Sequence, residues 1–332
     1  MSRTAPTPND LSIRQLQYVV AVADTLGFHR AAAQLHVSQP TLSAQIQQLE
    51  TVLGVTIFER DRRRVLVTPA GEEIVARARR VLVEVGDLLS AVSRRRDPFE
   101  GTLRIGVIPT VAPYLLPDVT PAVAAKYPKL RLALREEKTP DVVAELREGK
   151  LDAGLLALEA DLGPDLDHAV ILEDPFVVAL PHGHPLAGHK RIDMEELERE
   201  HVLLLDDGHC FRTQALALCS KAGVKEADLR ATSLGTLVQM VSSGAGATLL
   251  PQMAVPVENR RAQLEIRPLS PPTPRRTIAL IWRNESPLGK PLRELAGVLQ
   301  AALRGAAAPR EAREARAEDR RRRAGGGLAK QV

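Results

Sequence analysis

The sequence of 332 residues contains only two cysteines, and the first of them, Cys210, has neighbours that could make its thiol reactive. Asp207 or Gly208 can cap a helix whose first turn contains Cys210. A thiol at that position lies at the positive end of the helix dipole, and His209 and Arg212 add positive charge. All three features favour the thiolate, which is the reactive form of the side chain. We therefore expect Cys210 to be the reactive thiol of this chain.

The second cysteine, Cys219, follows the apolar run 215–218 of the same expected helix, so it should be buried and less ionised. Nine helical residues separate two Cα atoms by about 13–14 Å and place them on opposite faces. A disulfide needs Cα atoms within about 4.4–6.8 Å. Joining Cys210 to Cys219, through a peroxide-generated sulfenic acid at Cys210, would therefore require the helix to unwind. The alternative is that both are unreactive helix residues.

Zinc binding is the other chemistry that cysteine and histidine side chains could support. The sequence has no C-x-x-C pair, so a closed four-ligand site lacks candidates. His182, His184 and His189 form a loose group in a Pro- and Gly-rich loop, where surface positions are expected. A glycine-rich phosphate loop and a nucleophile elbow are also missing from the sequence. We expect neither a metal nor a cofactor.

Composition and charge restrict the possible partners. Aromatic residues make up only 3% of the chain, which argues against binding of single-stranded nucleic acid by stacking. The formal net charge is +4, and the positive excess lies at the two ends of the chain. The first apolar stretch is not followed by a cleavage-like site, so the chain is expected in the cytoplasm. The uncharged run 231–257 contains Ser, Gly and Pro residues, which favours a buried helix and a strand over a membrane span.

The elements that position these residues begin with an N-terminal winged helix-turn-helix. Helices are predicted at 13–26, 28–35 and 40–53, and two short strands at 55–58 and 65–67. Ser38 can cap the third helix, which Pro40 opens. In such motifs the second helix meets base edges in the major groove while basic residues bind phosphates. The expected DNA-binding residues are Ser38, Gln39, Thr41, Ser43 and Gln45 for base edges, Arg30, Arg62, Arg63 and Arg64 for the backbone, and Pro40 at the start of the same helix.

A long helix follows, with Thr68 as its cap and Pro69 in its first turn. Its apolar positions alternate in steps of four and three, which is typical of a coiled-coil seam. The seam consists of Ile74, Ala78, Val81, Val85, Leu88 and Val92. An identical chain is the expected partner of this face, and packing against its own domain is the alternative.

Beyond the expected hinge at 94–98 the chain alternates strands and helices, which is typical of βαβ units with a parallel sheet. Strands are predicted at 103–108, 130–134, 153–157, 176–180, 202–205, 230–232, 247–250 and 277–282. Helices are predicted at 111–125, 140–148, from 210, from 234 and at 287–304. Two α/β lobes with a cleft between them are expected. The resulting domains are 1–67, the linker helix 68–96, the two-lobed region 97–304 and a disordered basic tail, 305–332, with arginines at 320–323.

The N-terminal segment resembles the DNA-binding region of LysR-type transcriptional regulators. The resemblance depends on Ala31-Ala32-Ala33-Gln34-Leu35-His36-Val37-Ser38-Gln39-Pro40-Thr41-Leu42-Ser43 and on Thr68-Pro69-Ala70-Gly71, and it continues through 304. It implies an effector-sensing domain with two lobes like those of periplasmic binding proteins. It also implies homodimers or homotetramers on promoter DNA, with RNA polymerase as a further partner and no membrane attachment.

The stretch around Cys210 is similar to that of the hydrogen-peroxide sensors of this family, as are Arg230-Ala231-Thr232-Ser233-Leu234 and Leu249-Leu250-Pro251. The resemblance implies that Cys210 and Cys219 are redox-active. The residues that it assigns to the peroxide pocket are Thr110, Thr139, His209 and Arg276. Thr213 and Asp228 depart from some members, which have Asp and His there, so the relay that assists peroxide cleavage is expected to differ.

The resulting hypothesis is a peroxide-sensing transcription factor that is not an enzyme, because one peroxide is consumed per switching event. A second hypothesis keeps the DNA-binding half but places a small organic effector in the cleft and leaves both thiols inert. A third is a thiol peroxidase that acquired a DNA-binding domain.

Overall fold

The computed structural model describes residues 7–60, 64–93, 97–158, 162–224 and 226–306. The chain forms two compact units, residues 1–95 with 147–149, and residues 96–146 with 150–332. Most of the expected hinge and the basic tail beyond residue 306, including arginines 320–323, lie outside the described residues.

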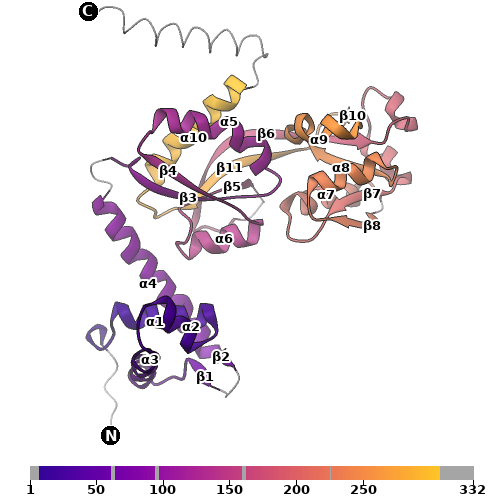
Figure 1. Cartoon of the computed structure of the whole chain (residues 1–332). Helices are drawn as coiled ribbons and strands as arrows, with labels where there is room; N and C mark the ends of the chain where they lie inside the picture. Colours follow the sequence, from indigo (N-terminus) through magenta and orange to yellow (C-terminus); the bar gives the residue numbers. More distant parts are fainter. Residues whose placement is uncertain (1–6, 61–63, 94–96, 159–161, 225, 307–332) are drawn as a thin grey trace, which may run out of the picture. The chain divides into compact units, whose positions relative to one another are not determined.

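The N-terminal unit is the predicted winged helix-turn-helix (Figure 1). It consists of η1 (Pro8–Asp10), α1 (Ile13–Thr25), α2 (Phe28–Gln34), α3 (Gln39–Leu53), the antiparallel strands β1 (Phe58–Arg60) and β2 (Val65–Val67), and α4 (Pro69–Ser93). The side chain of Ser38 caps α3 by accepting from the backbone N–H of Thr41. Buried apolar residues from α1, α2, α3 and β1, among them Val22, Leu42 and Phe58, form the core of this unit.

The first strand of the wing begins at Phe58 and not at residue 55 as predicted. The backbone N–H of Val55 still bonds to Glu50 in the last turn of α3. The carboxylate of Glu50 accepts from the N–H groups of Ile57 and Phe58, at 2.7 and 3.1 Å. Residues 55–57 are therefore held against the end of α3, and strand pairing starts only at Phe58.

The first lobe of the second unit is a mixed sheet with the strand order β4-β3-β5-β11-β6, in which β6 spans Leu166–Leu180. Its elements are β3 (Gly101–Val107), α5 (Ala112–Lys126), β4 (Leu130–Glu136), α6 (Thr139–Arg147), β5 (Ala153–Ala157), β11 (Arg275–Arg283) and α10 (Gly289–Ala306). Strand β3 is parallel to β4 and β5, as the βαβ pattern predicts, but β11 is antiparallel to both of its neighbours. The βαβ units are therefore parallel, and the sheet is mixed because the strand that closes the fold, β11, returns to this lobe in the opposite direction.

The second lobe has the strand order β10-β6-β9-β7-β8. It contains β7 (Val202–Leu205), α7 (Cys210–Lys221), β8 (Glu226–Ala231), α8 (Leu234–Ser242), β9 (Ala247–Pro251), α9 (Val255–Ala262) and β10 (Glu265–Pro268), with short 3₁₀ segments η2 (Pro185–Gly188), η3 (Met194–Arg199) and η4 (Gln252–Ala254). The run 231–257 contains α8 and β9, as predicted, and ends in η4 and the first residues of α9. Among the described residues, no helix has both the length and the apolar character needed to span a bilayer.

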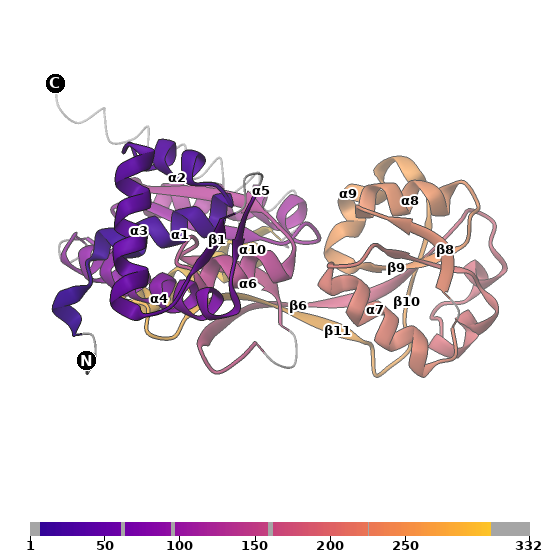
Figure 2. The ribbon, with the colours of Figure 1, turned by 90° about the horizontal axis from the view of Figure 1, so that it is seen from below.

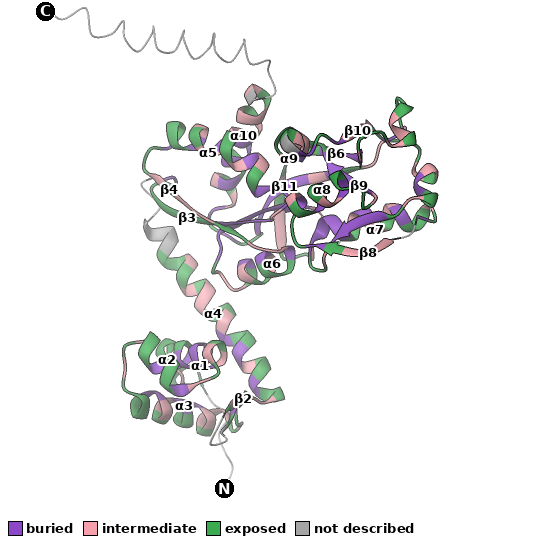
Figure 3. Cartoon of the chain, turned by 45° about the vertical axis from the view of Figure 1, so that its right-hand side comes forward, coloured by how far each residue is buried: buried purple, intermediate pink, exposed green. Residues whose placement is uncertain are grey.

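Strand β6 (Leu166–Leu180) belongs to both lobes. Its first part pairs with β11 in the first lobe, and Phe176 to Leu180 pair with β9 and β10 in the second. Figure 2 shows β6 and β11 running between the two lobes. Figure 3 shows that buried surface is concentrated along the strands of each lobe. The two lobes have separate apolar cores, which lie on either side of this crossing.

Candidate functional site

Helix α7 carries both cysteines and follows β7 through a short turn. Cys210 is the first residue of α7, and His209 is its N-cap, without a side-chain capping bond. The predicted caps, Asp207 and Gly208, are therefore wrong. Gly208 has a φ of +86°, a conformation that side chains rarely adopt, and it forms the turn before the helix. The carboxylate of Asp207 accepts hydrogen bonds from arginines instead of the helix N–H groups.

The two thiols are not joined, and both are buried. Cys210 packs with the core of the first lobe, whereas Cys219 packs with the core of the second. Helix α7 is continuous between them, so the helical separation calculated from the sequence applies. Burial raises the pKa of the Cys219 thiol to about 11, and the nearby charge of Glu226 acts in the same direction. Cys219 is therefore a protonated thiol at neutral pH.

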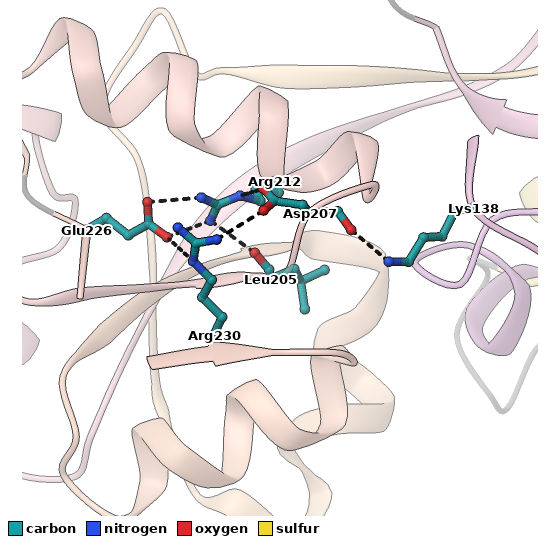
Figure 4. Close-up of polar contacts among 6 residues, drawn as sticks. All are labelled: Lys138, Leu205, Asp207, Arg212, Glu226 and Arg230. Carbon is teal, nitrogen blue, oxygen red and sulfur yellow. Dashed lines mark hydrogen bonds and ion pairs between the residues drawn. The ribbon is translucent and has the colours of Figure 1, made fainter. Parts of the chain in front are cut away.

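The two positive groups expected beside Cys210 do not add net charge there. The guanidinium of Arg212 binds the carboxylates of Asp207 and Glu226, so its charge is balanced (Figure 4). Burial lowers the pKa of His209, and the charge of Lys138 lowers it further, while Asp206 opposes both effects. His209 is therefore neutral at neutral pH. The position of Cys210 at the N-terminus of α7 is the feature that still favours its thiolate.

The lowered pKa of His209 predicts a pH-dependent stability. Below its ordinary pKa of about 6.5 the histidine of the unfolded chain takes up a proton, while the folded protein resists protonation. The free energy of unfolding should thus be highest above pH 6.5 and fall as the pH drops below that value. Urea unfolding across this range should show a weaker fall for His209→Gln than for the wild type. His168→Gln, at an exposed position on β6, is the control, and equal slopes for the two variants would contradict the prediction.

Arg276, on β11, is the centre of a buried polar cluster at the crossing of the lobes. Its Nε donates to Asp174 at 3.0 Å, and its Nη1 donates to the Thr110 hydroxyl at 2.8 Å. Nη2 donates to the carbonyl of Thr110 at 2.9 Å and lies 3.5 Å from the sulfur of Met253. The guanidinium also lies over the ring of Phe211, 5.4 Å from its centroid. Arg276 thus connects Thr110 to the residue that follows Cys210.

Sequence reasoning missed Asp174, which completes this cluster. Its carboxylate binds Arg276 and also accepts from the backbone N–H of Met253 at 3.0 Å. Burial raises the pKa of Asp174, while the charge of Arg276 opposes that shift. Asp174 lies 102 residues from Arg276 in the sequence, so no local pattern could indicate the pair.

A pocket of about 360 Å³ opens between the lobes. Thr110 and His209 line it, together with Glu136, Lys138 and Glu258 and other residues from both lobes. Its described lining residues do not include Cys210, Thr139 or Arg276, so the structure brings two of the four predicted pocket residues to one cavity. The volume is far larger than hydrogen peroxide needs, since a water occupies about 30 Å³, and it is typical of small-molecule sites.

Thr139 lies at the start of α6, and its hydroxyl is buried without a hydrogen-bond partner among the described residues. A buried hydroxyl without a partner is unfavourable by about 1–3 kcal/mol. A small polar molecule that donated to or accepted from Thr139 would remove this penalty.

The predicted DNA-binding residues lie at the start and in the first half of α3 and on the neighbouring elements. Ser38, Gln39, Pro40 and Thr41 are exposed, while Ser43 and Gln45 are half-buried. Arg30 on α2 and Arg64 beside β2 are exposed. Arg62 and Arg63 lie outside the described residues. The exposed polar start of α3 is therefore available to a major groove.

The apolar stripe of α4 has two parts. Ile74 packs against the core of the N-terminal unit and Ala78 is buried, which agrees with the alternative to a coiled coil for this half. Val81 and Leu88 are exposed, and Val85 is half-buried. The side chain of Val92 lies outside the described residues. Among the described residues of the stripe, Val81 and Leu88 are thus the ones exposed to a partner.

Comparison with known proteins agrees with this arrangement. Residues 13–72 match the family described as bacterial regulatory helix-turn-helix protein, lysR family, and residues 96–304 match the LysR substrate binding domain. The chain is 44% identical over 296 residues to the DNA-binding transcriptional dual regulator OxyR of Escherichia coli K12, covering 89% of this chain and 97% of that protein.

Solved structures of similar proteins span both units. A full-length OxyR from Pseudomonas aeruginosa with a Cys-to-Asp substitution aligns with a TM-score of 0.72 at 36% identity, covering 87% of this chain and 95% of that one. A hydrogen-peroxide-bound Cys-to-Ser mutant of OxyR from Corynebacterium glutamicum aligns with a TM-score of 0.60 at 36% identity, covering 88% and 94%.

Proposed function

Because this chain belongs to the LysR family of bacterial transcriptional regulators, we propose that it senses hydrogen peroxide through Cys210 and Cys219 and thereby controls oxidative-stress genes. The proposal is supported above all by the positions of the two cysteines. The two cysteines are buried in the cores of different lobes at the two ends of one helix. A disulfide between them therefore requires a change of fold, which is what a switch needs.

In the proposed reaction the Cys210 thiolate attacks one oxygen of the peroxide, the O–O bond breaks, and the second oxygen leaves as water after taking up a proton. Cys210 becomes a sulfenic acid. Cys219 then gives up its proton, its sulfur attacks the sulfur of Cys210 to form the disulfide, and the hydroxyl of the sulfenic acid leaves with a proton as a second water. Overall, two thiols are oxidised and one peroxide is reduced to two waters.

The four predicted pocket residues have distinct proposed roles in the first step. The hydroxyls of Thr110 and Thr139 hold the peroxide oxygens, and Arg276 stabilises the charge that develops on the leaving oxygen. His209, which is neutral, can exchange a proton with that oxygen. The buried hydroxyl of Thr139, which lacks a partner among the described residues, supports its assignment.

We propose that the DNA-binding residues of α3 and the wing contact promoter DNA, and that the exposed half of the α4 stripe joins two copies of the chain. We also propose that the chain forms homodimers or homotetramers and interacts with RNA polymerase, which its membership of the family supports. A reducing cytoplasm would reset the thiols after each signal. Because each switching event consumes one peroxide, the chain acts as a sensor and not as a peroxidase.

A small organic effector is the second candidate for the signal, and the size of the pocket between the lobes favours it. In that case Cys210 and Cys219 are inert. A Cys210→Ser protein would then still respond to its signal.

Promoter footprints before and after a small excess of hydrogen peroxide distinguish these functions. The wild-type footprint and transcription should change with peroxide, and the Cys210→Ser footprint should stay in the reduced pattern. Peroxide consumption should stop after about one equivalent per chain, whereas sustained turnover with a recycling reductant would indicate a thiol peroxidase. An unchanged wild-type footprint would exclude peroxide sensing and leave the effector-binding regulator.

A further inference from the structure

Four charged side chains form a closed ring beside α7 (Figure 4). Arg212 binds Asp207, Asp207 binds Arg230, Arg230 binds Glu226, and Glu226 binds Arg212, so positive and negative groups alternate around the ring. We call these four residues the charge ring. It connects α7 to the turn that precedes the helix and to strand β8, which follows it.

The Arg212–Glu226 pair is the strongest part of the charge ring. Both terminal nitrogens of Arg212 donate to the two oxygens of Glu226, at 2.6 and 3.1 Å, and Nη1 also donates to the carbonyl of Leu205 at 3.1 Å. The side chain of Arg212 is 8% exposed and that of Glu226 is 22% exposed, against 74% for Asp207 and 45% for Arg230. Two-pronged pairs shielded from water are stronger than exposed ones. The pKa of Glu226 is correspondingly lowered, chiefly by its hydrogen bond with Arg212.

Arg212 lies between the two cysteines, two residues after Cys210. Its three anchors, the Leu205 carbonyl, Asp207 and Glu226, all lie outside the segment between the cysteines. While these bonds hold, the first turn of α7 is fastened to β7 and β8. When the first turn unwinds so that Cys210 approaches Cys219 from about 13–14 Å to disulfide distance, it leaves its place and carries Arg212 with it.

We propose that the charge ring is an electrostatic latch on α7, closed when both cysteines are thiols and opened at Arg212 when the Cys210–Cys219 disulfide forms. This inference rests on the proposed peroxide-sensing function. It identifies the residues that set the redox potential of the Cys210–Cys219 pair. An interaction present in only one of two states shifts their equilibrium toward that state. The latch therefore favours the dithiol and raises the potential.

Glu226→Gln tests the latch with little change of shape, because it removes the charge and keeps one acceptor for Arg212. We expect the equilibrium constant for disulfide formation in glutathione redox buffers to rise about tenfold, which corresponds to a potential about 30 mV more negative. Asp228→Asn removes the same charge from an exposed position on the same strand and should leave the constant unchanged. Arg230→Gln, at an exposed position in the charge ring, should shift it in the same direction by less.

Thermal unfolding of both redox forms separates a latch from a simple structural role. Glu226→Gln should lower the melting temperature of the dithiol protein more than that of the disulfide protein. An equal loss in both forms, with an unchanged redox equilibrium, would show that Arg212 keeps its partners after oxidation and would overturn the latch while leaving the sensor intact. Absence of a Cys210–Cys219 disulfide in the wild type would overturn the sensor and the latch together.

Discussion

Replacing Arg276 by Met is expected to lower the free energy of unfolding by about 3–5 kcal/mol, because it leaves the carboxylate of Asp174 buried without a counter-charge. The side chains of Arg276 and Asp174 are 0% and 2% exposed. Water therefore cannot replace the lost guanidinium. Chemical unfolding of the dithiol protein, followed by circular dichroism, measures the loss. Arg275→Met, at an exposed position next along the same strand, is the matched control and should change stability little.

The same substitution should slow the reaction of Cys210 with hydrogen peroxide by about 10²–10³-fold, the usual effect of removing one donor to a developing oxyanion. The double variant Asp174→Asn/Arg276→Met separates the two effects. It removes the unpaired charge and keeps an acceptor for the Met253 N–H, so it should recover most of the stability. It should not recover the rate, measured by trapping of the sulfenic acid. Recovery of both would mean that Arg276 only supports the fold and has no role in the peroxide reaction.

Short strands that are buried on both faces were predicted to the residue. Strands β5, Ala153–Ala157, and β7, Val202–Leu205, are uninterrupted apolar runs whose residues are all buried. A run of this kind has a clear beginning and end in the sequence because polar residues cannot enter it.

Residues 166–175 of β6 were not predicted as a strand, and the reason is the opposite one. Residues 166–175 include Asp167, His168 and Glu173, and their exposure varies along the strand because it is only partly covered. Strand β10, Glu265–Pro268, has no apolar run, and it is defined by its backbone pairing with β6. Such elements depend on partners that are distant in the sequence, so local periodicity does not show them.

The candidate site likewise has some features that local sequence signals indicate and others that they do not. The helical context of Cys210 follows from local signals, and the structure contains that helix. The buried partner of Arg276 and the carboxylates around Arg212 do not follow from local signals. Asp174 pairs with Arg276, and Glu226 pairs with Arg212. These pairs determine how much positive charge each arginine presents to a thiol. Electrostatics at a site of this kind therefore has to be read from the fold.

Replacing Leu88 and Leu89 by Asp is expected to convert the protein from a dimer or larger assembly to a monomer. These side chains are 66% and 64% exposed on α4, and Val81 extends the same exposed apolar surface. Adjacent exposed leucines on a long helix are typical of an interaction surface. Two carboxylates there would have to be desolvated in a helix pair, which is strongly unfavourable. Analytical ultracentrifugation measures the change.

Loss of the dimer should weaken binding to a promoter with two half-sites by about 10²–10⁴-fold, because the second half-site is then no longer bound from a tethered partner. Binding to an isolated half-site should change little, since α3 and the wing are untouched. Val257→Asp, at an exposed apolar position on α9, is the control for the effect of an added carboxylate. A double variant that remained dimeric with wild-type DNA affinity would show that the exposed half of the α4 stripe does not join the subunits. The assembly would then depend on the second unit of the chain.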